Sequence, residues 1–258
     1  MAKSFHNIAT VFLLFLLLIF LPYGNSTNFK LPRFNVQSTD MLYQGDAAPN
    51  AGTIELISNV NYLCRVGWAT FANTIQLWDS ASGKFSDFAT HFSFTIDTLD
   101  RPIYGHGITF FLAPAGAQIP PNSAGGFLGL FNTTTRDSSQ NHIVMVEFDT
   151  FPNPEWDPAV EHVGININSV ASSVYTPWNA SLHSGDTADA WITYDSASKN
   201  LSVSWTFQKT LSPLEKTSLS YVIDLKAILP EWVTVGFTAA TGQYGARHIL
   251  KSWEFSSS

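Results

Sequence analysis

The sequence predicts an all-β fold, either a β-sandwich or a jelly roll. Apolar and polar residues alternate with period two in several runs, among them residues 92–96, 163–167 and 201–207. Such alternation places the apolar side chains on one face of a strand and Ser, Thr or Asn on the other. Turn-forming clusters, for example residues 79–83 and 195–200, separate the runs. Many strands joined by regular turns favour a sandwich or jelly roll.

The length and composition fit a single domain with little helix. Sandwiches of roughly 200 to 250 residues fold as one unit, so a chain of 258 residues does not require two domains. Hydrophobic residues make up 45% of the chain and charged residues 13%, which is ample material for a large core. Only residues 223–229, before Pro230, indicate a brief helical turn. We find no repeat, low-complexity linker or composition break.

The charge and the missing motifs exclude several classes of function. The formal net charge is -7, and Lys and Arg do not cluster. Binding to nucleic acid or to anionic lipid needs a basic patch, so we expect neither partner. Gly-x-Ser-x-Gly, Walker and His-Glu-x-x-His patterns do not occur. The common hydrolase, nucleotide and zinc-protease chemistries therefore have no anchor in this sequence.

The N-terminus has the layout of a secretory signal peptide. A lysine precedes an unbroken apolar run at residues 11–21, and Gly24 and Ser26 are small residues of the kind that a signal peptidase prefers. The run is shorter than the ~20 apolar residues that a membrane span needs, and no second run follows, so we expect no membrane span. We predict a signal peptide at residues 1–26 and a secreted, extracellular domain at residues 27–258.

The predicted export bears on three asparagines and one cysteine. Acceptor patterns for N-linked glycans begin at Asn132, Asn179 and Asn200. Cys64 is the only cysteine, so stability must come from the core and not from an internal disulfide. We interpret Cys64 as a buried and unreactive side chain, because it lies in the apolar-rich stretch 62–68. A free reactive thiol is the alternative.

Two carboxylates lie close together at the end of an apolar run. Glu147 and Asp149 fall within residues 143–149, and in a strand they point to the same face, as does Phe151. Like charges at that distance repel unless something neutralises them. A cation is the simplest neutraliser, because an unpaired buried charge is too costly.

The residues that follow supply further metal ligands. The loop at residues 151–158 contains Asn153 and Asp157, which offer the oxygen ligands that Ca²⁺ takes in numbers of about six to eight. His162 opens the next strand and offers the imidazole that a transition metal accepts. Two neighbouring ions that share Asp149 and Asp157, only one of them bound to His162, would account for the set. The alternative is a group of separate surface polar residues around a turn.

Glycoside hydrolysis is a competing interpretation of the paired carboxylates. Jelly-roll hydrolases also place two carboxylates on a strand, where they act as acid and nucleophile. They need a second acid aligned on the same face. The next residue on that face is Phe151, and this favours a binding protein over an enzyme.

The pattern of residues 146–162 resembles the Mn²⁺/Ca²⁺ site of the legume (L-type) lectin family. The resemblance runs from about Phe29 to Phe255 and includes further family marks at residues 90–94, 110–114, 125–129, 162–165, 235–242 and 252–253. It implies a concanavalin-like jelly-roll β-sandwich and a carbohydrate-binding lectin that is not an enzyme. It also implies Ca²⁺ and Mn²⁺ as cofactors and glycans or glycoproteins as partners.

The resemblance implies a ligand for each ion. The implied Mn²⁺ ligands are Glu147, Asp149, Asp157 and His162, with Ser172 acting through water. The implied Ca²⁺ ligands are Asp149, Asn153, Asp157 and the carbonyl of Phe151. In such lectins the calcium ion orients a shallow sugar pocket.

The resemblance also implies how that pocket binds sugar. Asn153 would bond sugar hydroxyls, the Gly126 amide would donate another bond, and Phe151 would offer its face to the ring. A sugar has an apolar face that suits an aromatic ring and a polar rim that needs a few fixed donors and acceptors. Gln243 and Tyr244 are further candidates for sugar contact, although a plain turn explains them equally well.

His106 departs from the family pattern. It lies in Gly105-His106-Gly107, where the family has a cis-linked Asp that accepts bonds from two sugar hydroxyls. An imidazole does not offer the two acceptor oxygens of a carboxylate. A role in ligand contact and a role as a packed or surface imidazole both stay open. The variant is similar to the extracellular lectin domains of plant lectin receptor kinases.

Two functions therefore remain in view. The first is a metal-dependent lectin, secreted to the extracellular space (apoplast), that recognises glycans in defence or signalling. The second is a receptor-type interaction domain with weak or lost simple-sugar binding and a non-sugar or protein ligand, located at the plasma membrane if the chain is part of a longer receptor. A homodimer is a further expectation, because legume lectins often pair through sheet edges or faces.

Overall fold

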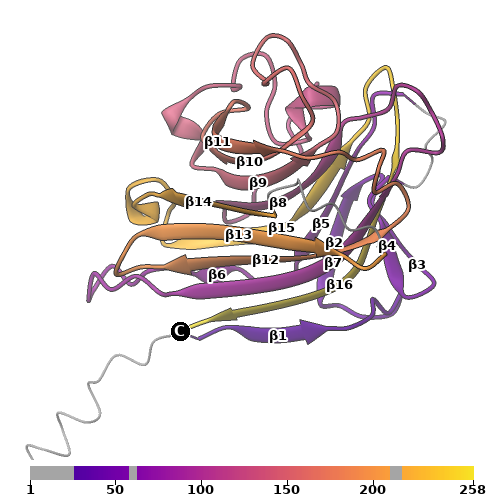
Figure 1. The fold of residues 1–258 in the computed structure, drawn as a ribbon. Coiled ribbons are helices and arrows are strands. Elements are labelled where there is room, and N and C mark those ends of the chain that lie inside the picture. The colour runs from indigo at the N-terminus through magenta and orange to yellow at the C-terminus, as the bar shows by residue number, and fades with distance from the viewer. Residues whose placement is uncertain (1–25, 58–62, 210–216) are drawn as a thin grey trace, which may run out of the picture.

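The protein is a sandwich of two antiparallel sheets (Figure 1). The computed structural model describes residues 26–57, 63–209 and 217–258. These two sheets confirm the predicted all-β jelly roll in a single domain. The apolar run at residues 11–21, on which the predicted signal peptide depends, lies outside the described residues. No helix among the described residues is long and apolar enough to cross a membrane.

We call the two sheets sheet 1 and sheet 2. Sheet 1 contains, in spatial order, β14 (Ser218–Val222), β13 (Asn200–Phe207), β12 (Thr187–Asp195), β7 (Phe88–Asp97), β16 (Arg247–Ser257), β4 (Thr53–Glu55) and β3 (Ala48–Asn50), with β1 (Asn28–Leu31) also paired to β16. Sheet 2 contains β11 (Ser172–Pro177), β10 (His162–Ile167), β9 (Val144–Asp149), β8 (Gly107–Pro114), β15 (Trp232–Ala240), β5 (Val66–Phe71) and β2 (Met41–Gly45), with β6 (Ile75–Gln76) paired to β15.

Helical structure in the described residues is limited to three short 3₁₀ turns. They are η1 (Gly125–Phe127), η2 (Ser139–Asn141) and η3 (Leu225–Ala227). The third lies within residues 223–229, where the sequence indicates a helical turn. Its first turn is capped by the Asp224 side chain, which accepts a hydrogen bond from the Lys226 N–H.

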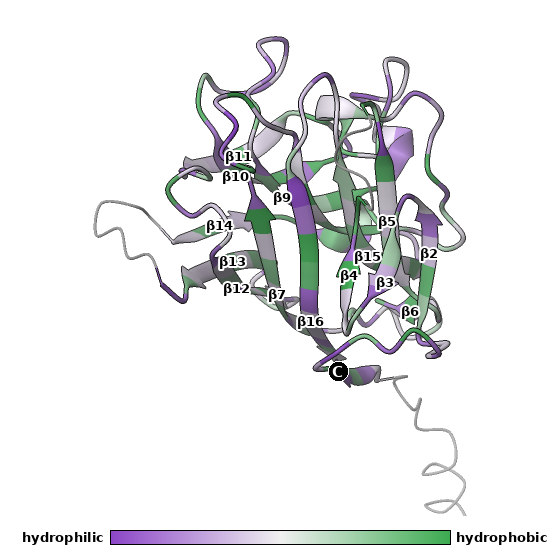
Figure 2. Cartoon of the chain, turned by 90° about the vertical axis from the view of Figure 1, so that its right-hand side faces the viewer, coloured by the Kyte–Doolittle hydropathy of each residue, from purple (hydrophilic) through white to green (hydrophobic). Residues whose placement is uncertain are grey.

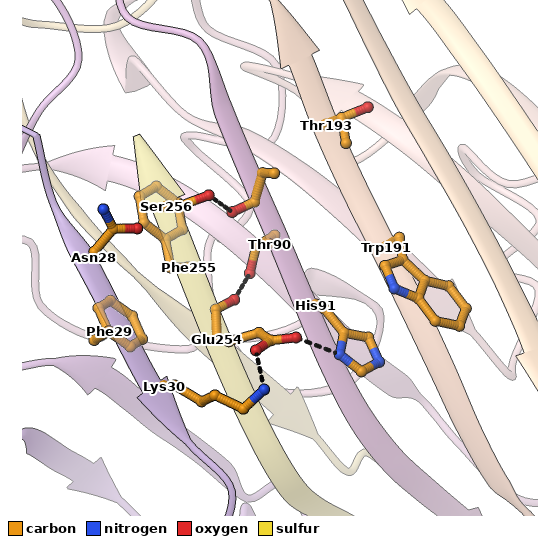
Figure 3. A pocket seen from close by; sticks show the side chains of 11 residues that line it. Asn28, Phe29, Lys30, Thr90, His91, Trp191, Thr193, Glu254, Phe255 and Ser256 are labelled. Carbon is orange, nitrogen blue, oxygen red and sulfur yellow. Dashed lines mark hydrogen bonds and ion pairs between the residues drawn. The ribbon is translucent and has the colours of Figure 1, made fainter. Parts of the chain in front are cut away.

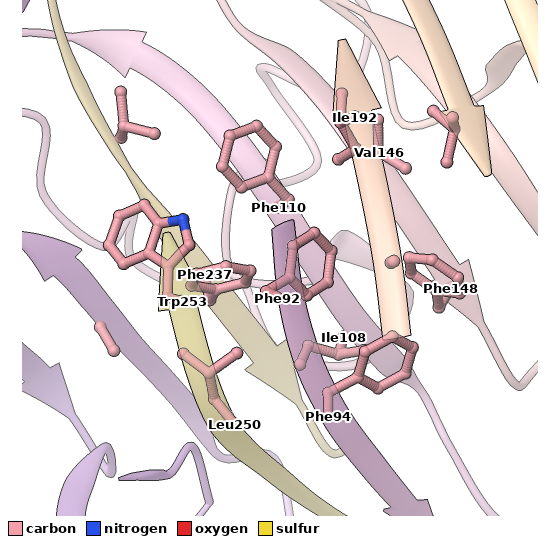
Figure 4. Packing of buried hydrophobic residues seen from close by; sticks show 14 of the residues in the cluster. Phe92, Phe94, Ile108, Phe110, Val146, Phe148, Ile192, Phe237, Leu250 and Trp253 are labelled. Carbon is pink, nitrogen blue, oxygen red and sulfur yellow. The ribbon is translucent and has the colours of Figure 1, made fainter. Parts of the chain in front are cut away.

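Aromatic side chains from both sheets form the main core (Figure 4). The Phe92 ring of sheet 1 lies 4.8 Å from the Phe237 ring of sheet 2, and Phe237 lies 4.9 Å from Trp253 of sheet 1. Phe94 and Phe148 meet in the same way at 4.7 Å. Each fully buried side chain of this size stabilises the fold by about 1.5–3 kcal/mol. These contacts hold the two sheets together.

Sheet 2 is buried on its second face as well. Trp68, Phe111 and Met145 point away from sheet 1 and pack against Leu128 and Phe131 in the connection between β8 and β9. That connection lies over β9 to β11 in Figure 1, coloured pink. The Trp68 indole also donates a 3.0 Å hydrogen bond to the Gly129 carbonyl. Side chains of sheet 2 therefore anchor the segment that contains Gly126.

Sheet 1, in contrast, exposes its outward face, by which we mean the face turned away from sheet 2. Buried and accessible residues alternate along β12, β13 and β16, and Figure 2 shows hydrophilic and hydrophobic stretches following one another along β16. The outward residues on these strands are mostly polar, with the exposed Trp191 among them. One expectation about a loop was wrong, because Cys64 is exposed and not buried. Its backbone lies in a left-handed turn at φ 54°, outside the apolar core.

Candidate functional site

The paired carboxylates lie where two strands of sheet 2 run side by side. Glu147 and Asp149 are on β9, opposite Gly164 and His162 of β10. Only 1% of each carboxylate residue is exposed, and His162 is fully buried. Both acids lie on the face away from sheet 1, as the sequence predicts, because Val146 and Phe148, which alternate with them along β9, belong to the core between the sheets. His162 begins β10, also as predicted.

A glycine makes room for the contacts in this cluster. A Cβ atom at Gly164 would lie 2.1 Å from Ser172 Oγ and 2.7 Å from Glu147 Oε1. The Ser172 hydroxyl donates a 2.5 Å hydrogen bond to Glu147 Oε1, and His162 Nε2 lies 3.2 Å from both oxygens. The sequence argument did not single out Gly164, although its position two residues after His162, on the same strand face, is a signal that could have found it.

The loop after β9 brings its acids to the same place. The Phe151 N–H donates to Asp149 Oδ1 at 2.8 Å, and the Asn153 N–H donates to Asp157 Oδ2 at 2.7 Å. Trp178, which the sequence argument missed, donates its buried indole N–H to the Asp149 carbonyl at 2.7 Å. The loop is therefore folded back on the end of β9.

Burial and mutual repulsion dominate the electrostatics of the cluster. Burial raises the pKa of Asp149 well above its usual value, and the charges of Glu147 and Asp157 raise it further. Burial also raises the pKa of Asp157 to about 7. Burial alone would lower the pKa of His162, but its hydrogen bond to Glu147 and the charges of Glu147 and Asp157 raise it overall. With all of these acids ionised, the site would have an excess of negative charge that one histidine does not balance.

The residue types fit two hard or borderline cations. Carboxylates and an amide oxygen are Ca²⁺ ligands, and an imidazole added to carboxylates suits Mn²⁺. Asn153 Oδ1 is buried and has no hydrogen-bond partner, as expected of an oxygen that would bind an ion. Within the described residues, no three His, Cys, Asp or Glu side chains are arranged to hold an ion. Glu147, His162 and Ser172 form hydrogen bonds with one another instead.

The side chains expected to contact sugar gather beside this cluster. The His106 ring lies 4.6 Å from the Phe151 ring, and Phe151 stacks on Tyr244 at 5.6 Å. A Cβ atom at Gly126 would lie only 2.1 Å from Asn153 Oδ1, so glycine is needed for that approach. Gln243 lies in the same loop as Tyr244 with an exposed side chain, and it makes no hydrogen bond within the described residues.

His106 is buried at the centre of this group. Only 4% of the residue is exposed, its peptide bond to Gly105 is cis, and Nδ1 has no hydrogen-bond partner. A Cβ atom at Gly242 would lie 2.4 Å from His106 Nε2. Burial lowers the pKa of His106 to about 4, and the neighbouring Asn153 offsets only part of that effect. The imidazole is therefore neutral near pH 7, with one donor and one acceptor nitrogen.

A clamp that the sequence argument missed ties three loops together around the site. The Tyr104 hydroxyl donates to Glu161 Oε1, and the Ala180 N–H donates to Glu161 Oε2 at 2.7 Å. Tyr104 precedes the Gly105–His106 peptide, and Glu161 precedes His162. Burial, together with this carboxylate, raises the pKa of Tyr104 well above its usual value. Glu161 is therefore an anchor for the loops and no member of the predicted ligand set.

A family comparison identifies the chain. Residues 26–258 match the family described as the legume lectin domain. The chain belongs to the legume lectin family. This legume lectin shares 53% identity over 254 residues with the L-type lectin-domain containing receptor kinase IX.1 of Arabidopsis thaliana, an alignment that covers 97% of the chain and 39% of the kinase. It thus spans about two fifths of that receptor's length.

Lectins and solved structures of lectins agree with this assignment. Lectin 7 of Medicago truncatula is 40% identical over 242 residues, covering 91% of our legume lectin and 90% of Lectin 7. The structure of lectin UEA-II complexed with galactose superposes with a TM-score of 0.82 at 36% identity, covering 90% of this chain and 98% of that one. Lectin 7 and UEA-II are lectins by name, and the UEA-II structure is a complex with galactose.

Proposed function

We propose that this legume lectin is a secreted protein that binds glycans or glycoproteins outside the cell and depends on Ca²⁺ and Mn²⁺ to do so. One observation carries the proposal. Asn153 belongs to both halves of the site, since its N–H donates to Asp157 of the acidic cluster and its side-chain oxygen lies against Gly126. A site that couples an acidic cluster to an aromatic-lined surface suits a metal-ordered sugar pocket.

The acidic cluster supplies the proposed metal ligands. Glu147, Asp149, Asp157 and His162 would hold Mn²⁺, with Ser172 through water, and Asp149, Asn153, Asp157 and the Phe151 carbonyl would hold Ca²⁺. Bound cations would supply the positive charge that this cluster lacks. The chain itself contributes the loop hydrogen bonds from Phe151 and Asn153, which orient both residues toward the neighbouring surface.

The neighbouring surface supplies the proposed sugar contacts. Phe151 and Tyr244 offer aromatic surface for the apolar face of a sugar ring. The Asn153 side chain and the Gly126 amide supply fixed polar groups, and His106 supplies one nitrogen acceptor or donor. Gln243 is exposed at the rim, where it would meet a second sugar residue.

A second candidate is a receptor-type interaction domain that has lost simple-sugar binding. His106 favours it, because the buried ring occupies space beside Gly242 and Phe151 and offers no carboxylate. In that case the ligand would be a protein, a non-sugar molecule or an altered glycan. The chain would then act at the plasma membrane as part of a longer receptor, and the metals would serve structure.

A glycan array of residues 27–258 separates the two candidates. We expect binding in the presence of Ca²⁺ and Mn²⁺ and its loss after chelation. A protein that stays folded but is silent on the array in both conditions would contradict the lectin and favour the interaction domain. Analytical ultracentrifugation of the same sample would test the predicted homodimer.

The variant His106→Asp tests whether the imidazole limits sugar affinity. A carboxylate accepts two hydrogen bonds where the neutral imidazole accepts one, so we expect simple-sugar affinity to rise by about tenfold, the equivalent of one charge-assisted hydrogen bond. Calorimetric titration of monosaccharides measures it. Because burial alone would raise the pKa of an Asp here, His106→Asn is the control that offers an acceptor without charge. No gain in either variant would contradict the assigned role.

A further inference from the structure

A glycan acceptor pattern lies on the outward face of sheet 1, at the start of β13. Asn200, Ser202 and Ser204 point outward, because Leu201 and Val203 between them are buried. The Asn200 side chain donates one N–H to Ser202 Oγ at 2.8 Å. An amide nitrogen carries two hydrogens. Attachment of a sugar replaces one of them, so the observed hydrogen bond and a linked glycan are compatible.

A groove begins at Ser202, the next outward residue along β13 after this asparagine. Its volume is about 370 Å³, and its lining includes Thr193 of β12, Ser202 and Ser204 of β13, and Ser218 and Ser220 of β14. Four of these five residues, all except Ser202, have hydroxyl groups that make no hydrogen bond within the described residues. Unpaired hydroxyls in a row are suitable partners for the hydroxyl groups of a sugar chain.

An exposed tryptophan lines the far end of the groove. Trp191 is opposite Ser204 across the β12–β13 pair, whereas Asp195 is opposite Asn200. Asn200 and Trp191 are thus four residues apart along the ladder, about 13 Å at ~3.3 Å per residue. The Trp191 side chain is 40% exposed although large apolar side chains are usually buried. Trp191 is therefore placed to contact a ligand that covers the outward face of sheet 1.

The orientation of Trp191 is fixed by its neighbours. The indole stacks on the His91 ring at 4.7 Å and 8° (Figure 3). His91 is held in turn by Glu254 at 3.0 Å and Asp189 at 3.2 Å. One face of the indole is therefore covered by imidazole, and the indole also lines the groove on the side of β13 and β14. An aromatic surface held in this way is preorganised for stacking.

We propose that Asn200 carries an N-linked glycan whose inner sugars lie in this groove and stack on Trp191. The inference rests on the proposed export of the chain and goes beyond it. The attachment point, the row of hydroxyls and the aromatic surface occur in that order on one face, and covalent attachment gives the glycan a high effective concentration there. Stacking between a sugar and an indole removes apolar surface from water. The glycan then covers the outward face of sheet 1.

Release of the glycan from the native protein tests the proposal. The chain is expressed in plant cells, treated with an endoglycosidase without denaturation, and sampled over time by glycopeptide mass spectrometry. We expect release from Asn200 to be about fivefold slower than from Asn132 or Asn179, because a stacking contact protects it. Trp191→Ala should restore the faster rate at Asn200 and leave the other two sites unchanged. Trp232→Ala is the matched control, because Trp232 is 41% exposed on sheet 2.

Oxidative footprinting of Trp191 provides a readout that does not depend on a tryptophan variant. In Asn200→Gln we expect hydroxyl-radical oxidation of Trp191 to rise several-fold while that of Trp232 stays constant. A glycan at Asn132 or Asn179 together with an unmodified Asn200 would overturn this proposal but leave the predicted export standing. Bare asparagines at all three positions would overturn it together with the predicted export. Equal release rates, or unchanged oxidation of Trp191, would overturn the stacking.

Discussion

The described residues include two clusters in which a histidine lies beside carboxylates, and these clusters differ in burial. In the first, His162 Nε2 lies 3.2 Å from Glu147 Oε1, and these side chains are 0% and 1% exposed. In the second, on the outward face of sheet 1, His91 lies 3.2 Å from Asp189 and 3.0 Å from Glu254. The side chains of the second cluster are 20–37% exposed. Similar groups are therefore surrounded by protein in one cluster and partly by water in the other.

The acids of the two clusters shift in opposite directions. In the buried cluster, burial raises the pKa of Asp157 to about 7. In the exposed cluster, hydrogen bonds from Lys30 and His91 lower the pKa of Glu254. Asp189 follows the same direction, because its hydrogen bonds outweigh the effect of its partial burial. Burial thus raises the pKa of Asp157 in the first cluster, whereas hydrogen bonds from their partners lower the pKa of the more exposed carboxylates in the second.

The partners of the acids indicate which of the two clusters a cation from solution would stabilise. The exposed acids have Lys30 and His91 as cationic or polar partners supplied by the chain itself. The buried cluster combines Glu147, Asp149 and Asp157 with a single histidine. Removing several carboxylates from water without enough positive charge is costly. The chain's own partners account for the exposed cluster, whereas the buried cluster agrees with the proposed binding of cations.

Metal removal should have the largest effect and should act on the buried cluster alone. A ligand present at about 100 times its Kd stabilises the folded state by about 2.7 kcal/mol. For a domain of this size each kcal/mol corresponds to roughly 2–4 °C in Tm, so chelation should lower Tm by roughly 5–10 °C. Differential scanning calorimetry with Ca²⁺ and Mn²⁺, and then with a chelator, measures this. An unchanged Tm would remove the argument for ions at this site.

The pH dependence of the metal-free protein should have the second largest effect. An acid whose folded pKa is raised stabilises the fold fully below its unfolded value, and this contribution disappears as the pH rises through the folded value. For Asp157 the window runs from 3.8 to about 7. We therefore expect the metal-free protein to be more stable at pH 5 than at pH 8, by an amount on the order of 2 kcal/mol after allowance for partial exposure.

Denaturant unfolding at the two pH values, with and without metals, measures this difference. Bound cations should abolish the trend, because they favour the charged carboxylates at every pH in that range. The same slope in both samples would mean that the acids titrate independently of any ion.

Much of the fold follows from local pattern. Period-two alternation predicts the strands, and β12, β13 and β16 alternate in burial as expected. The burial of both faces of β9 is harder to foresee, because it depends on the distant connection from β8 that covers Met145. Cys64 shows the same limit. Its apolar neighbours predicted burial, but a left-handed turn places it in solvent.

The site shows a similar division. Glu147, Asp149 and His162 could be chosen from sequence because strand parity and one short loop bring them together. Glu161 could not be assigned in this way, since its partners Tyr104 and Ala180 come from separate loops and meet only in the folded chain. The same reason explains why the burial of His106, which depends on Gly242 and Phe151, was left open.

The smallest expected effect comes from a matched pair of substitutions, Glu254→Gln and Glu147→Gln. Each keeps the size of the side chain and one acceptor oxygen while it removes a charge. Glu254 is 37% exposed, so its variant should change stability by less than about 1 kcal/mol, with or without metals. Glu147→Gln should reduce the Tm difference between metal-loaded and chelated protein, because one proposed Mn²⁺ ligand is lost and repulsion within the metal-free cluster falls. If both variants responded equally to chelation, burial would not be what distinguishes the clusters.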